Sequence, residues 1–224
     1  MTLDFDAFTL AAATADLDEE PDARAHADCV EFRMDLADSP SERLAAYDGD
    51  LPLLVTNRAD WEGGEAADEG RLETLAEALA HDAVEAVDIE LATLEDGDGG
   101  DVLDRADAEG VAVVVSTHDF EKTPSKGRLQ SLLTRAGTYG DVAKLAVTAE
   151  DRTDTLALLS ATHELTERGQ RVATMAMGEA GSHTRAVAPV YGSKIGYAPV
   201  DPAKATAPGQ YDLATLRSLV DSLG

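Results

Sequence analysis

Short apolar or alternating runs recur along the chain at a spacing that fits a strand followed by a helix. They predict eight strands, at Phe8–Thr14, Cys29–Leu36, Leu51–Asn57, Ala86–Leu91, Val111–Thr117, Val142–Val147, Arg171–Met177 and Lys194–Ala198. Leucines and alanines fall at helical spacing behind acidic first turns at Asp68–His81, Asp151–Arg168 and Asp212–Leu223. Strands that alternate with helices in this way predict a parallel sheet.

Eight strand–helix repeats in 224 residues favour a closed (β/α)8 TIM barrel of the α/β class. No low-complexity linker divides the chain, so we expect residues 1–224 to form a single barrel domain. The alternative is an open doubly wound sheet. The chain has no GxGxxG after the first predicted strand and no GxxxxGK[ST] anywhere, so a nucleotide site is not supported.

The chain is strongly acidic, with 44 aspartate and glutamate residues against 18 lysine and arginine residues and a formal net charge of −26. A field of that sign repels nucleic acids and anionic membranes, so neither is an expected partner. The acid excess and the scarcity of lysine resemble proteins from a salt-saturated cytoplasm, where ions screen the self-repulsion. We therefore expect a halophilic protein.

Targeting signals are not recognisable in the sequence. No basic start precedes an apolar core, and no apolar run approaches the roughly 20 residues that span a bilayer. We expect a soluble, cytoplasmic protein. The single cysteine, Cys29, cannot form an intrachain disulfide, and its apolar neighbour Val30 indicates a buried thiol rather than a reactive one.

Lys144 lies in the apolar run Val142–Thr148, in a chain with only five lysines. Burial disfavours the ammonium form, so a lysine on a buried strand tends toward a lowered pKa and a free amine. Such an amine can condense with a ketone. The alternative is a snorkelling or salt-bridged lysine at a strand end.

Polar residues gather where the predicted strands end, which is where barrel enzymes carry their active sites. The positions are Glu31, Arg33 and Asp35 along the second strand, Arg58 and Glu62 after the third, Asp88 and Glu90 on the fourth, and His118 after the fifth. Alternation places Glu31, Arg33 and Asp35 on one face of their strand. Histidine is the usual proton carrier near neutral pH.

Each of these groups also has a structural interpretation. Glu31 and Arg33 could form a structural salt bridge braced by Asp88 and Glu90. The carboxylates and His118 could in principle hold a divalent ion, although no convincing metal triad is present. Met175 and Met177, which share a face of the seventh strand, could simply fill the core.

Gly178 to Arg185 forms a glycine-containing segment after the seventh strand. It could be an ordinary helix cap. Its glycines also permit close approach of the backbone to an anion, and the Arg185 guanidinium can bind a carboxylate through two hydrogen bonds.

With these residues in place, the chain resembles type I 3-dehydroquinate dehydratase of the shikimate pathway over nearly its whole length. The resemblance is carried by Glu31-Phe-Arg33-Met-Asp35, Thr56-Asn-Arg58 with Glu62, Asp88-Ile-Glu90, Ser116-Thr-His118-Asp-Phe120, Lys144 on its strand, Met175-Ala-Met177-Gly178 with Gly181 and Arg185, and Ala207-Pro-Gly-Gln210.

The resemblance implies a (β/α)8 barrel, usually dimeric, that dehydrates 3-dehydroquinate to 3-dehydroshikimate without a metal or an organic cofactor. It makes Lys144 the Schiff-base lysine, His118 the general acid and base, and Glu62 the group that orients His118. The residues implied to bind or enclose the substrate are Glu31, Arg33, Arg58 and Gln210 at its hydroxyls and ring, Arg185 at its carboxylate, Met175 and Met177 as pocket walls, and Thr206 and Tyr197.

The sequence departs from the family pattern in a few places. Thr184 and Thr206 stand where the family typically has serine, and Tyr197 stands where phenylalanine is usual. Two other functions remain as alternatives. One is a class I aldolase, which shares the barrel and the imine lysine, and the other is a non-catalytic barrel that binds a carboxylated ligand.

Overall fold

The computed structural model describes residues 3–201, 203 and 209–224. These residues form one sheet of eight parallel strands, in which each strand pairs with its neighbour in the chain and the eighth pairs with the first. The strands are β1 (Thr9–Thr14), β2 (Cys29–Arg33), β3 (Leu53–Thr56), β4 (Val84–Glu90), β5 (Ala112–Asp119), β6 (Val142–Thr148), β7 (Val172–Met177) and β8 (Ile195–Pro199). A bridge between Val172 and Ser193 joins the segment before β8 to β7 and nearly closes the barrel.

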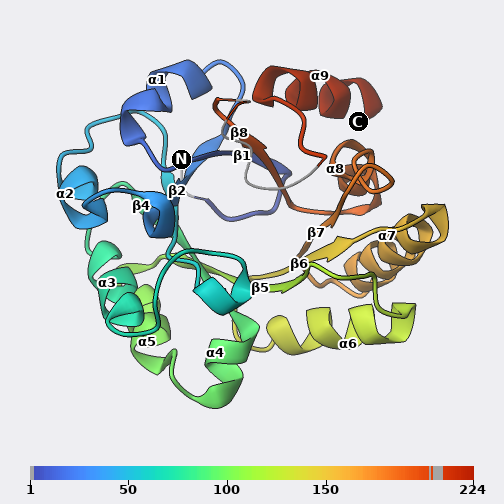
Figure 1. Ribbon diagram of the computed structural model, residues 1–224, viewed down its shortest axis with the longest axis horizontal. Helices are drawn as coiled ribbons and strands as arrows, with labels where there is room; N and C mark the ends of the chain where they lie inside the picture. Colours follow the sequence, from blue (N-terminus) through green and yellow to red (C-terminus); the bar gives the residue numbers. More distant parts are fainter. Residues whose placement is uncertain (1–2, 202, 204–208) are drawn as a thin grey trace.

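The helices surround the strands (Figure 1). They are α1 (Glu20–Ala23), α2 (Pro40–Ala45), α3 (Arg71–Ala78), α4 (Leu91–Asp96), α5 (Gly100–Glu109), α6 (Lys126–Ala136), α7 (Arg152–Thr166), α8 (Thr184–Val187) and α9 (Leu213–Leu223). Four short 3-10 helices are also described, η1 (Leu17–Glu19), η2 (Met34–Leu36), η3 (Asp60–Glu62) and η4 (Ala188–Tyr191). The predicted (β/α)8 TIM barrel is therefore confirmed.

The inside of the barrel is filled by side chains rather than open. Small and branched residues from successive strands, among them Leu54, Val114 and Ile195, pack there with Leu3 and Phe5 from the N-terminal segment. A second and larger cluster lies between the strands and the outer helices. Because the interior is packed, a site can form only at the end of the barrel, and in barrels of this kind it forms at the C-terminal ends of the strands.

The second strand is shorter than the sequence predicted. It ends at Arg33, and Met34–Leu36 turns into a 3-10 helix. The prediction that Asp35 shares an inner strand face with Glu31 and Arg33 is therefore wrong. The Asp35 carboxylate instead accepts two hydrogen bonds from the Arg33 guanidinium, at 2.9 and 2.7 Å.

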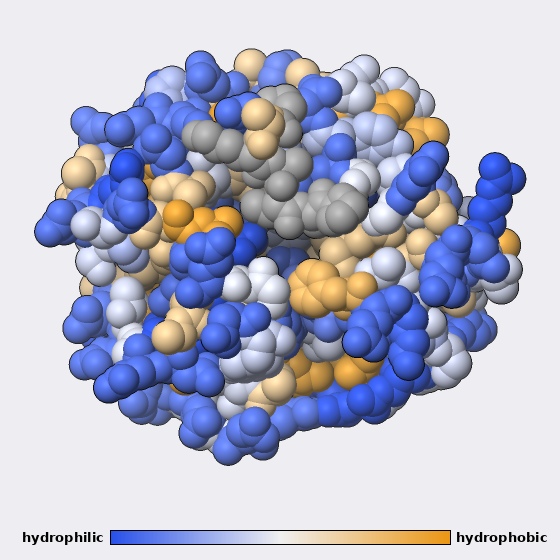
Figure 2. Space-filling model, in the orientation of Figure 1, coloured by the Kyte–Doolittle hydropathy of each residue, from blue (hydrophilic) through white to orange (hydrophobic). Residues whose placement is uncertain are grey.

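The viewed surface of the molecule is mostly hydrophilic, as the acidic composition predicts (Figure 2). Cys29 is fully buried, as expected, and its burial raises the pKa of the thiol. Across residues 3–201, 203 and 209–224, no helix combines the length and the apolar character needed to cross a membrane.

Candidate active site

One pocket opens at the C-terminal end of the barrel and is lined by charged, aromatic and methionine side chains. Its lining residues are Glu31, Arg33, Thr56, Arg58, Glu62, Gly63, His118, Phe120, Lys144, Ala146, Met175, Met177, Arg185, Tyr197 and Gln210. Every residue to which the resemblance assigns a catalytic or substrate-binding role lines this pocket except Thr206, which lies outside the described residues. Parallel strands bring these residues together because their carboxyl ends share one rim.

Lys144 lies on β6 with its amine inside the pocket, and the residue is only 5% exposed. Its Nζ is 2.8 Å from Asp88 Oδ2 and 3.8 Å from Glu31 Oε1. The same Nζ lies 4.2 Å from the centre of the Tyr197 ring. The salt-bridged lysine of the alternative interpretation is thus real, but it lies within the pocket and not at the surface.

Asp88 connects Lys144 to a second cation, Arg58. Arg58 donates to Asp88 Oδ1 at 2.6 Å, to Glu90 Oε1 at 3.0 Å and to Ser116 Oγ at 2.6 Å. Burial alone would raise the pKa of Asp88, but the charges of Arg58 and Lys144 outweigh it and hold that pKa below its usual value. The Asp88 carboxylate is therefore a fixed negative charge beneath the amine.

Asp88 and Glu90 do not brace a Glu31–Arg33 pair, as the structural interpretation of the sequence suggested. Glu90 lies between two arginines, because its other oxygen accepts from Arg71 at 2.8 Å. Arg33 pairs with Asp35, and Glu31 accepts from the Thr56 hydroxyl at 3.1 Å. Asp88 and Glu90 on β4 therefore pair with Arg58, Arg71 and Lys144, and not with a salt bridge on β2.

The side chains of His118 and Glu62 are in hydrogen-bonding contact at the pocket wall. Glu62 lies in η3, and its Oε1 accepts from the backbone N–H of His118 at 2.9 Å and lies 3.0 Å from His118 Nδ1. An Nδ1–H directed at Glu62 leaves Nε2 as the ring nitrogen that can accept a proton. An ionised Glu62 therefore holds the ring in place and favours the tautomer that carries its proton on Nδ1.

Burial sets the protonation of this pair. It lowers the pKa of His118 well below its ordinary value, an effect reinforced by the positive charges of Arg58 and Lys144. It raises the pKa of Glu62 to about 7, with help from the negative charges of Glu90 and Asp88. Neutral His118 is therefore available as a base at physiological pH.

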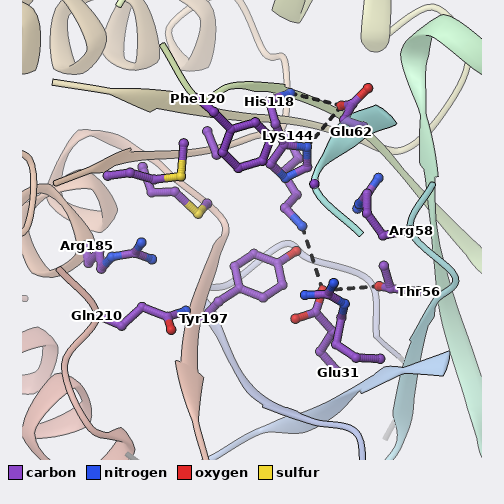
Figure 3. A pocket seen from close by; sticks show the side chains of 15 residues that line it. Glu31, Thr56, Arg58, Glu62, His118, Phe120, Lys144, Arg185, Tyr197 and Gln210 are labelled. Atoms are coloured by element: carbon purple, nitrogen blue, oxygen red, sulfur yellow. Dashed lines mark hydrogen bonds and ion pairs between the residues drawn. The ribbon is translucent and has the colours of Figure 1, made fainter. Parts of the chain in front are cut away.

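Arg185 lies at the other side of the pocket from Arg58, near Gln210 (Figure 3). The residue is 4% exposed, no carboxylate of the described residues forms a salt bridge with it, and its Nε has no hydrogen-bond partner there. Desolvation lowers the pKa of this guanidinium to about 10, so it still carries its charge at neutral pH. A buried guanidinium without a paired anion leaves its N–H donors free for an anionic ligand that enters the pocket.

Thr184, at the start of α8, does not line the pocket. Its hydroxyl accepts from the Ala176 N–H at 2.8 Å and donates to the Gly181 carbonyl at 2.7 Å. The hydroxyl thus fixes the turn between β7 and α8. Arg185 is the second residue of α8. Met175 and Met177 face the pocket from β7, as the sequence predicted.

Phe120 lines the pocket, although the sequence pattern did not predict a role for it. Its ring stacks on that of His118, with centroids 5.8 Å apart and planes 9° apart, and it is half exposed at the mouth. Its place two residues after His118, in the segment that follows the predicted strand, was the signal that could have found it. Phe120 shields the imidazole from solvent.

The described residues contain no group of three or more histidine, cysteine, aspartate and glutamate side chains with the geometry to hold a metal ion. Glu62 is paired with His118, and Asp88 and Glu90 are engaged with arginine and lysine side chains. The divalent-ion alternative is therefore not supported by the arrangement of these side chains.

The sequence matches the model of the type I 3-dehydroquinase family over residues 8–224. It is 64% identical over 225 residues to a 3-dehydroquinate dehydratase from Haloarcula marismortui, with 99% of this chain and 98% of the relative covered. The corresponding enzyme from Halobacterium salinarum is 53% identical over 225 residues, with 99% and 100% covered.

Solved structures that resemble this chain include enzymes of the same name as its sequence relatives. A 3-dehydroquinate dehydratase from Geobacillus kaustophilus superposes with a TM-score of 0.86 at 30% identity, covering 97% of this chain and 91% of that one. A type I enzyme from Clostridium difficile, described with covalent modified comenic acid, also has a TM-score of 0.86, at 28% identity with 97% and 92% covered.

Proposed function

Because the chain belongs to the type I 3-dehydroquinase family and is a 3-dehydroquinate dehydratase, we propose that it removes water from its substrate through a Schiff base on Lys144. The enzyme is a hydro-lyase of the shikimate pathway. The observation that carries the mechanism is the placement of the Lys144 amine in one pocket with His118. The covalent ligand described for the Clostridium difficile relative is consistent with a nucleophile in such a pocket.

Lys144 supplies the covalent step. Its deprotonated amine attacks the ketone carbon of 3-dehydroquinate, and loss of water leaves an iminium. The positive nitrogen withdraws electrons, so a proton on the neighbouring carbon becomes acidic. The fixed charge of Asp88, 2.8 Å from Nζ, stabilises the positive nitrogen without a covalent role.

His118 moves the proton. Its neutral imidazole removes the proton next to the iminium carbon and then protonates the departing β-hydroxyl, and water finally releases 3-dehydroshikimate from Lys144. Glu62 stabilises the transient imidazolium because its oxygen lies 3.0 Å from Nδ1. Phe120 keeps bulk water away from the stacked ring.

Substrate binding is divided between the two sides of the pocket. Arg185 binds the substrate carboxylate, which neutralises the unpaired guanidinium. Glu31, Arg33, Arg58 and Gln210 face the hydroxyls and the ring, and Met175 and Met177 wall the pocket. Thr206 lies outside the described residues, so its proposed contact with the substrate rests only on the resemblance to the family.

Borohydride trapping tests this mechanism. Reduction in the presence of 3-dehydroquinate should add the mass of the reduced adduct at Lys144, and Lys144→Ala should form no adduct and no conjugated enone product. Lys194→Ala is the matched control, because Lys194 donates to the Asp6 carbonyl away from the pocket and its loss should leave both readouts unchanged. An adduct at another residue would contradict the scheme.

His118→Ala separates imine formation from proton transfer. The adduct should still form at Lys144, whereas the rate of enone formation should fall by about 10²–10⁴-fold, the usual contribution of a general acid and base. The same absorbance assay distinguishes the alternatives. A class I aldolase would cleave a carbon–carbon bond, and a non-catalytic binding barrel would bind the substrate without turnover.

We also infer that residues 1–224 form one catalytic domain that works in the cytoplasm as a homodimer. A single sheet contains all eight described strands, which supports one domain. Exposed apolar side chains on α7 and η4, including Leu156 and Val190, could be covered by a second copy. Sedimentation velocity in concentrated salt tests the dimer, and a monomer at all protein concentrations would contradict it.

A further inference from the structure

Tyr197 has a buried hydroxyl that the scheme above does not use. The residue lies on β8, is 4% exposed and lines the pocket. Its hydroxyl oxygen has no hydrogen-bond partner within the described part of the chain. Buried hydroxyls are nearly always hydrogen-bonded, so an unpartnered one that faces a pocket indicates a group supplied by the ligand.

The position of this hydroxyl relates it to Lys144. The lysine amine lies 4.2 Å from the centre of the Tyr197 ring. Figure 3 shows the ring between Arg185 and Gln210 on one side and Glu31 and Thr56 on the other, with its hydroxyl end turned toward Lys144 and Glu31. The hydroxyl is therefore on the side where the ketone reacts and not on the side of Arg185.

The hydroxyl is a donor rather than an acid at this site. Burial, together with the negative charges of Glu31 and Asp88, raises the pKa of Tyr197 well above its ordinary value, so the phenol keeps its proton. The neighbouring guanidinium groups already donate elsewhere, Arg58 to Asp88, Glu90 and Ser116, and Arg33 to Asp35. A substrate oxygen near Nζ can therefore accept from the Tyr197 O–H, whose hydrogen bond is not already used within the described residues.

We propose that Tyr197 is a catalytic hydrogen-bond donor to the oxygen on the carbon that Lys144 attacks. This inference rests on the proposed Schiff base. When the C–N bond forms, the carbonyl π electrons move to the oxygen, and that oxygen takes up the proton that the nitrogen releases. Tyr197 keeps its own proton and stabilises the developing negative charge through its O–H, as donors in an oxyanion hole do.

The test compares wild type with Tyr197→Phe, which removes only the hydroxyl. Enzyme and 3-dehydroquinate are mixed, quenched with borohydride at successive times, and the rate of adduct formation at Lys144 is followed by mass spectrometry. We expect the rate of adduct formation and kcat/KM to fall by about tenfold, the upper range for one neutral hydrogen bond. The final amount of adduct and the melting temperature should not change.

Tyr191→Phe is the matched control, because Tyr191 is exposed in η4 and does not line the pocket. Its adduct formation should match that of wild type. Wild-type rates in Tyr197→Phe would overturn the proposal, and so would a defect that appears only after the adduct has formed. Failure of the wild type itself to trap at Lys144 would instead overturn the Schiff base, so the two failures are distinguishable.

Discussion

At the scale of single residues, the site combines groups that are individually costly to bury. Lys144, Arg58 and Asp88 are each buried, yet their charges are compensated by one another through contacts of 2.6 to 2.8 Å. Arg185 is the exception, since no carboxylate of the described residues pairs with it. The Arg185 Nε and the Tyr197 hydroxyl thus have no partner among the described residues of the pocket, and we propose that the substrate supplies both partners.

Glu62 gives the site a pH dependence. Because its pKa is raised to about 7, it loses its negative charge as the pH falls through that value, and with it the ability to stabilise the His118 imidazolium. Lowering the pH from about 8 to about 6 should reduce kcat/KM about tenfold, as expected for one titrating group. Initial rates of enone formation measured across this range check the prediction.

Glu62→Gln removes the titrating group but keeps a polar side chain. We expect lower activity than wild type at about pH 8 and loss of the fall in kcat/KM near pH 7. If the variant kept the same fall at the same pH, another group would control it and the assignment of the titration to Glu62 would be wrong.

At the scale of elements, the loops after the strands determine where the side chains of the site lie. Glu62 reaches His118 because the segment after β3 turns back on itself, with hydrogen bonds from Gly64 N–H to the Ala59 carbonyl and from Ala66 N–H to the Arg58 carbonyl. Gly64 lies so close to Arg58 that an added Cβ would collide with the Arg58 carbonyl oxygen. Glycine is required there by close approach of the backbone.

Gly64→Ala should therefore displace the loop that carries Glu62. We expect a loss of about 1–3 kcal/mol in the free energy of unfolding, typical of an overpacked position, together with a lower kcat. Denaturant unfolding and steady-state rates measure the two effects. Unchanged stability and kcat would show that the loop accommodates the methyl group.

Gly127→Ala provides the control for Gly64→Ala. Gly127 lies in α6, has no heavy atom within 4 Å of an added Cβ and does not adopt a positive φ. Alanine should stabilise this helix by roughly 0.5–1 kcal/mol, because glycine loses more backbone entropy on folding. Its kcat should equal that of wild type.

At the scale of the whole molecule, the net charge of −26 dominates behaviour in solution. Self-repulsion of that size destabilises a compact chain in dilute buffer, whereas the Debye length of about 3 Å at 1 M salt leaves only close contacts unscreened. The relatives from Haloarcula marismortui and Halobacterium salinarum agree with the expectation of a salt-adapted protein.

The melting temperature should accordingly rise steeply between dilute buffer and molar potassium chloride, as followed by circular dichroism across a salt series. Sucrose favours burial without screening charge, and it serves as the control that should not reproduce the full rise. Equal melting temperatures in dilute buffer and molar salt would contradict an electrostatic origin.

The sequence by itself determined the barrel and the membership of the site. Apolar runs that alternate with helical stretches allow few folds, and strand ends in a parallel barrel must meet at one rim, so Lys144, His118 and Arg185 could be grouped in advance. Strand boundaries were predicted to within about two residues, except that β2 stops at Arg33, where the chain turns into the 3-10 helix Met34–Leu36.

Only the tertiary structure decided how these side chains are paired. Lys144 and Asp88 are 56 positions apart, as are His118 and Glu62, and no local pattern specifies which carboxylate faces which cation. Pairing depends on side-chain direction and on the depth of each residue in the barrel. The same is true of the unpartnered Tyr197 hydroxyl and the unpaired Arg185, because the lack of a partner is a property of the packed molecule and not of the chain.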